Sequence, residues 1–220
     1  MLGRDRPGRR ADPARTLGAL QRRLQAIYRV EAPAVGRFLC GREVAARAGH
    51  APRAAEELLV LDEPEGLSVG LFLDDAVLEG AARGELSALA QAAEGVSHFL
   101  YLATRAEGGR PVSLLELEVQ GEVDKFTLLL APWRRARPRD RLRRSRALRR
   151  RLFEEGRFHA FLAAEELDRY REANRLGGGY ARWLEGRFAA GADVEGLWRE
   201  LRRSWRLGAG EKLGYLAARG

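Results

Sequence analysis

The chain of 220 residues carries a formal net charge of +8, with 45% hydrophobic and 32% charged residues. This apolar content allows an ordinary core, which excludes wholesale disorder and a collagen repeat, and the single cysteine excludes a disulfide-stapled miniprotein. The apolar runs are too short to cross a bilayer or to form the core of a signal peptide. We therefore expect a soluble cytoplasmic protein. Its basic residues are nearly all arginines, as a GC-rich bacterial genome would produce.

The first part of the chain predicts helices around one β-hairpin. Residues 1–13 mix glycine, proline and arginine without periodicity and predict a disordered basic tail. A helical domain is expected over residues 14–133, and it begins with leucines at helical spacing behind an Asp12 cap. Its β-hairpin falls at about residues 57–73, where two apolar runs flank a Pro-Glu-Gly turn. Because a lone hairpin is marginal in water, it should pack on helices or join a further strand.

A helical hairpin is predicted over about residues 85–131. Apolar residues recur at helical spacing in its first half, and the glycines and proline of residues 108–111 end that helix. Ser113 and Glu116 form a capping box that is typical of the start of a second helix. The two helices should therefore pack antiparallel.

The end of the chain predicts a small, aromatic-rich helical lobe over residues 152–220, beyond an arginine-rich connector over residues 134–151. Three consecutive glycines, 177–179, predict a kink in its first helix or a close approach of another helix. Trp198 and Trp205 lie one heptad apart and favour a core role over an interface. The predicted fold class is mainly α with one β-hairpin, an α+β fold, with a multi-helix N-terminal domain and the small C-terminal lobe.

The strongest functional feature is the connector, which holds eleven arginines and one acidic residue, Asp140. Several cations close together suit a phosphate backbone, since each neutralised phosphate releases counterions. We therefore expect a non-enzymatic accessory or regulatory protein that binds a phosphate-rich partner, in the first place nucleic acid. The competing interpretation is a solvated connector whose charge reflects genome composition. The candidate binding residues are Arg134, Arg135, Arg137, Arg139, Arg141, Arg143, Arg144, Arg146, Arg149, Arg150 and Arg151.

Polar residues of the helical hairpin support a second hypothesis, an acid/base or metal-dependent enzyme. Glu94 and His98 lie four residues apart on the first helix, and Glu118, Glu122 and Lys125 share one sector of the second. Two carboxylates facing a Glu/His pair are a ligand set of helix-bundle metal sites. The spacing argues against such a site, because di-iron bundles use Glu-x-x-His, and a lone histidine on a polar helix face is usually solvated. We therefore expect neither a metal nor a cofactor.

A third hypothesis is a protein-interaction module with no nucleic-acid role. Its C-terminal lobe would dock on a partner or on a second copy of the chain, and an acidic protein could also bind the arginine-rich connector. Cys40 has no neighbouring histidine and predicts a small core residue, and His159 between two phenylalanines predicts a structural or interface role. The sequence contains no P-loop, dinucleotide-binding or zinc-protease motif.

Overall fold

The computed structural model describes residues 12–47, 49, 52–63, 66–130, 137–155, 163–189 and 193–220. It is mainly helical with one small sheet, so the predicted α+β class is confirmed. The elements are α1 (Pro13–Tyr28), η1 (Val35–Arg37), β1 (Leu39–Cys40), α2 (Arg42–Arg47), β2 (Glu56–Glu63), β3 (Gly66–Leu73), α3 (Asp75–Arg83), α4 (Leu86–Glu107), α5 (Leu114–Leu130), α6 (Pro138–Arg149), η3 (Arg150–Glu154), α7 (Ala164–Leu184), η4 (Glu185–Ala189), α8 (Val194–Arg206) and α9 (Ala209–Ala217). Within these ranges, no helix combines the length and apolarity needed to cross a membrane.

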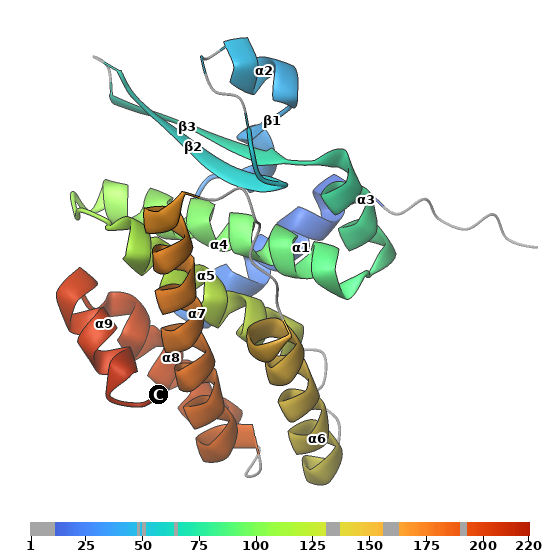
Figure 1. Cartoon of the computed structure of the whole chain (residues 1–220), viewed down its shortest axis with the longest axis vertical. Coiled ribbons are helices and arrows are strands. Elements are labelled where there is room, and N and C mark those ends of the chain that lie inside the picture. Colours follow the sequence, from blue (N-terminus) through green and yellow to red (C-terminus); the bar gives the residue numbers. More distant parts are fainter. Residues whose placement is uncertain are drawn as a thin grey trace, which may run out of the picture.

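The small sheet lies along one side of α4, at the top of Figure 1. Its strand order is β1-β3-β2, with β2 antiparallel and β1 parallel to β3. The predicted hairpin is therefore confirmed, and it both packs on a helix and joins a further strand. That strand contains only Leu39 and Cys40, which pair with Leu71 and Phe72, so it is too short to show as an alternating pattern.

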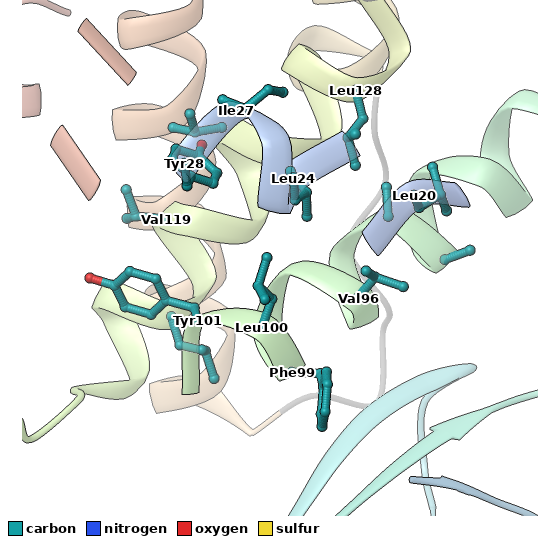
Figure 2. Close-up of a cluster of buried hydrophobic side chains, with 14 of the residues drawn as sticks. Leu20, Leu24, Ile27, Tyr28, Val96, Phe99, Leu100, Tyr101, Val119 and Leu128 are labelled. Carbon is teal, nitrogen blue, oxygen red and sulfur yellow. The ribbon is translucent and has the colours of Figure 1, made fainter. Parts of the chain in front are cut away.

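The first helix begins where the sequence predicts and ends at a left-handed residue. Asp12 accepts hydrogen bonds from the backbone N–H groups of Ala14 and Arg15, and Pro13 occupies the first helical position. Arg29 closes the helix with φ 56°. The apolar stripe of α1 crosses α4 and α5, and Figure 2 shows Leu24 and Leu100 pointing toward one another in that crossing.

Helix α5 is the centre of the molecule. Every residue from Glu116 to Leu129 is buried except Lys125, and the helix contacts α1, α4, α6, α7 and α9. A helix buried on all sides has no solvent face for its polar residues, so each of them must find a partner inside the protein. Asp124 does so completely, because one carboxylate oxygen accepts from the Tyr28 hydroxyl and the other from the Ser97 hydroxyl.

Helix α7 runs without interruption through its three glycines, so the predicted kink is wrong and the alternative, a close approach, is right. A Cβ atom at Gly177 would lie 2.5 Å from the Cβ of Glu122 on α5. A Cβ atom at Gly179 would lie 2.6 Å from the Cα of Gly220. The glycines cost helix propensity but let α5 and the end of the chain approach the α7 backbone.

The two ends of the described chain pack together. The Trp205 ring of α8 stacks on Tyr28 at the end of α1, with ring centroids 3.9 Å apart. The Nε atom of Arg202 donates a hydrogen bond of 2.6 Å to the carbonyl of Ile27, which the helix itself leaves unpaired. Trp205, one of the aromatic residues of the predicted C-terminal lobe, therefore belongs to the same hydrophobic core as α1.

Candidate metal centre

The polar residues singled out in the helical hairpin meet at one place in the structure. Glu94 and His98 lie one turn apart on α4, and they face Glu118, Glu122 and Lys125 of α5. The expectation of a solvated histidine is wrong, since His98 is only 4% exposed. It is buried because the sheet and α5 cover the α4 face that carries it. We call these five residues, with Glu56 of β2, the carboxylate–histidine cluster.

Each imidazole nitrogen of His98 faces a carboxylate. Nδ1 lies 3.4 Å from Oε1 of Glu56, and Nε2 lies 3.7 Å from Oε2 of Glu118. On the other side of the cluster, the Lys125 ammonium lies between two carboxylates, 3.1 Å from Oε2 of Glu94 and 3.1 Å from Oε1 of Glu122. The cluster thus consists of two cations, each held between two glutamates.

Glycines give the cluster its geometry. A Cβ atom at Gly121 of α5 would lie 2.7 Å from Nε2 of His98, so the imidazole ring sits directly against the α5 backbone. A Cβ atom at Gly95 of α4 would lie 3.0 Å from Cγ of Glu56. Because any larger residue at either position would push the imidazole or the β2 carboxylate away, the glycines fix how closely the three elements converge.

The cluster holds more negative than positive charge. Four glutamates surround His98 and Lys125. The positive charge of Arg169 on α7 lowers the pKa of Glu118, but the two side chains form no ion pair. Burial raises the pKa of Glu118 to about 7, and it also raises the pKa values of Glu56 and Glu122. An excess of buried carboxylate charge is costly unless protons or a further cation neutralise it.

In two groups of the cluster, Glu94 and His98, the pKa shifts in the direction that favours the charged form. Burial raises the pKa of Glu94, but the facing Lys125 ammonium and His98 hold it below its ordinary value. Burial lowers the pKa of His98, but Glu56 and then Glu118 outweigh it and raise the pKa to about 9. The imidazole is therefore protonated at neutral pH unless another cation takes its place beside the carboxylates.

Several atoms of the cluster lack a hydrogen bond within the described part of the chain. They are Nε2 of His98 and one carboxylate oxygen each of Glu56, Glu118 and Glu122, all buried. Buried polar atoms are almost always paired in native proteins, so a group of unpaired atoms in one place indicates a missing partner. Asp124, on the same helix and equally buried, shows no such deficit.

The positions of three side chains allow one ion to contact them together. Glu94, His98 and Glu118 each offer a ligand atom, and these atoms all lie within 4.8 Å of one another. Glu56 faces the far imidazole nitrogen, as carboxylates that orient a metal-bound histidine do. Sequence reasoning missed Glu56. The apolar run over residues 58–61 has no alternation, so the sequence gives no sign that Glu56 faces α4.

The described part of the arginine-rich segment is helical and packs on the rest of the protein. This part forms α6 and η3, docked on the protein through Leu148, which is 3% exposed, and through Ser145, whose hydroxyl donates to Glu185 at 2.8 Å. It is therefore more than a solvated connector. Arg134 and Arg135 lie outside the described residues, as do residues 1–11 of the predicted tail and His159.

The described arginines of this segment divide into two groups. Arg141 and Arg149 are half-buried, and Arg149 pairs with Glu154 at 2.6 Å. The others project from the outer face of α6 and η3, which Figure 1 shows at the edge of the molecule. They are Arg137, Arg139, Arg143, Arg144, Arg146, Arg150 and Arg151, and we call them the arginine ridge. Three of them pair with acidic neighbours, Arg143 with Asp140, Arg146 with Glu185 and Arg150 with Glu155.

Comparison with known proteins adds no family to this description. The chain matches no protein-family model, no curated protein and no solved structure.

Proposed function

We propose that the protein binds one divalent transition-metal ion through Glu94, His98 and Glu118, and that it is a metal-dependent enzyme. One observation carries the proposal: among the residues that the structure describes, the buried Nε2 atom of His98 has no hydrogen-bond partner, and it lies beside two carboxylates that can share an ion with it. An imidazole nitrogen with carboxylate oxygens is a ligand set that zinc, manganese and iron accept. Three protein ligands leave coordination positions for water, so hydrolysis is the reaction class that we favour.

The rest of the cluster supports this proposal. Glu56 would hold the proton on Nδ1 of His98 and so present the other nitrogen as the ligand. Lys125 forms ion pairs with Glu94 and Glu122, whereas Glu56 and Glu118 both lie against the single imidazole of His98. A bound cation would offset the remaining negative charge, which makes the cluster better suited to a metal than to a purely structural ion-pair network.

The direct test is the metal content of the protein purified without added metal, measured by plasma mass spectrometry. We expect close to one zinc, manganese or iron ion per chain. If the chelated protein neither rebinds any of these ions in calorimetry nor gains thermal stability from them, the metal centre is wrong.

The pH dependence of metal affinity provides a second, quantitative test. Because His98 has a pKa of about 9 in the metal-free protein, ion binding must displace its proton, and affinity should rise about tenfold per pH unit above neutrality. Below about pH 7, Glu118 also carries a proton, so the slope should approach about a hundredfold per unit. Zinc titrations against a competing chelator between about pH 6 and about pH 8.5 measure both slopes. A pH-independent affinity would place the ion elsewhere.

A second function, binding of nucleic acid through the arginine ridge, is supported by the placement of α6. Its inner face is fixed by Ser145 and Leu148, so the outward arginines are presented on a rigid helix. Arg137, Arg139, Arg144 and Arg151 form no ion pair with any residue that the structure describes. Guanidinium groups of this kind are free to contact phosphates.

A salt series tests the nucleic-acid proposal. With about four to six phosphate contacts, the logarithm of the affinity for duplex DNA should fall against the logarithm of salt with a slope of about −4 to −5. Changing Arg139, Arg144 and Arg151 together to glutamine should flatten this slope. A matched control changes Arg83, Arg171 and Arg175, which are exposed arginines in local ion pairs. If both triple variants bind like the native chain, the ridge has no such role.

A further inference from the structure

A concave pocket lies at the C-terminal end of α7, away from the metal centre. It has a volume of about 420 Å³ and lies between the end of α7, η4, α8 and the last residues of the chain. Trp183 and Phe188 form one wall, with their rings edge to face at a centroid distance of 5.9 Å. This volume falls in the range of sites that hold small ligands.

Four arginines line the pocket. Arg187 comes from η4, Arg199 and Arg203 from α8, and Arg219 from the end of the chain. Arg187 and Arg199 are exposed and form no ion pair within the described ranges. Clefts lined by one sign of charge focus the field and attract ligands of the opposite sign.

The two acidic side chains of the pocket are already occupied. Glu200 accepts hydrogen bonds from the Tyr180 hydroxyl at 2.9 Å and the Tyr215 hydroxyl at 2.7 Å, and it lies 3.5 Å from Arg219. Asp193 accepts from the backbone N–H of Gly196 at 2.7 Å and so caps the first turn of α8. Neither carboxylate therefore neutralises Arg187 or Arg199.

The arrangement of the arginines is unfavourable without an anion. Arg199 and Arg203 are four residues apart on α8, a spacing at which like charges destabilise a helix. The guanidinium groups of Arg203 and Arg219 lie over the same Tyr215 ring, at 5.1 and 3.5 Å from its centroid. Ring contacts hold these two cations in place, so the pocket is already organised for an anion before it binds.

We propose that this pocket binds a small phosphorylated ligand of nucleotide size. Arg187 and Arg199 would contact the phosphates, because the planar guanidinium group forms paired hydrogen bonds with phosphate oxygens. The wall formed by Trp183 and Phe188 would contact the flat, apolar part of the ligand. This inference does not depend on the metal centre or on the arginine ridge.

The test is calorimetric titration of the whole chain with ADP, pyrophosphate and adenosine, in the presence of EDTA so that no metal-bound phosphate contributes. We expect saturable binding of ADP, weaker binding of pyrophosphate and none of adenosine. Changing Arg187 and Arg199 to glutamine should weaken ADP binding at least tenfold. The matched control, Arg171→Gln with Arg175→Gln, changes two exposed arginines of α7 that pair with acidic neighbours and should leave binding unchanged.

Three results would overturn the proposal. Equal loss of binding in the two double variants would mean that only overall charge matters. Binding of adenosine as tight as that of ADP would exclude phosphate recognition. Binding of a single-stranded oligonucleotide without any binding of ADP would assign these arginines to a nucleic-acid surface. As an independent readout, Trp183→Phe should remove any change in tryptophan fluorescence that ADP produces.

Discussion

Glu118→Gln is expected to make the metal-free protein more stable while lowering its affinity for metal at least a hundredfold. The substitution keeps the shape of the side chain but removes one charge from a buried cluster with an excess of carboxylates. Because burial raises the pKa of Glu118 to about 7, the gain should be about 3 kcal/mol at mildly alkaline pH and should vanish in acid. The metal-bound state loses a charged ligand that an amide oxygen replaces poorly.

Asp124→Asn is the matched control, because Asp124 is an equally buried carboxylate on the same helix. Its two oxygens accept from Tyr28 and Ser97 and do not face the cluster. Burial raises the pKa of Asp124 as well, but the hydrogen bonds from Ser97 and Tyr28 stabilise its charge and offset part of that cost. The stability of this variant should therefore change less than that of Glu118→Gln, and its metal affinity should stay unchanged. Urea unfolding with and without EDTA, together with zinc titration of both variants, measures the difference. Equal effects of the two substitutions on metal affinity would contradict the assignment of Glu118.

The two lysines of the chain, Lys125 and Lys212, should respond differently to replacement by methionine. Lys125→Met leaves Glu94 and Glu122 without their shared cation, and it should cost about 3–5 kcal/mol at neutral pH. Burial lowers the pKa of Lys125, but the two glutamates outweigh it and hold the pKa above its ordinary value. The ammonium is therefore charged in the folded protein throughout the neutral range, and the loss should shrink as acid protonates the glutamates.

Lys212 provides the contrast. It donates to the Tyr101 hydroxyl at 2.9 Å, and burial lowers its pKa to about 7. Between about pH 7 and about pH 10 the unfolded chain therefore binds a proton that the folded protein does not. The native protein should gain up to about 1.4 kcal/mol per pH unit from this residue. Lys212→Met should abolish that gain and cost little at about pH 8. Equal losses for the two lysine variants in urea unfolding across this pH range would refute the assignment of charge states.

The local signals in the sequence predicted most of the elements, and longer-range contacts account for the differences. The Asp12 cap and the helical hairpin depend on residues close together in the chain, and the structure contains both. The glycines of α7 predict a kink from propensity alone, yet packing against Glu122 and Gly220 overrides propensity. Strand β1 has only two residues, and it forms because its backbone pairs with the free edge of β3, a contact that no local sequence pattern predicts.

The candidate site could be predicted in part. The helical wheel placed Glu118, Glu122 and Lys125 in one sector, and that sector faces α4 in the structure. It did not predict that His98 is buried or that Glu56 joins it, because β2 reaches α4 only through the tertiary fold. The arginine run predicted a cationic segment over residues 134–151. It did not predict that Arg149 would be half-buried, where it pairs with Glu154 and Glu185 of the tertiary fold.

The packing of Trp205 and Arg202 against the end of α1 has a consequence for synthesis. Residues emerge from the ribosome in order, so Tyr28 and the Ile27 carbonyl are available long before α8 exists. Until α8 is made, part of the apolar stripe of α1 stays exposed to solvent, and this exposed apolar surface can form non-native contacts. Helix α1 therefore reaches its final packing only after α8, 175 residues later in the chain at the Arg202–Ile27 contact, has been made.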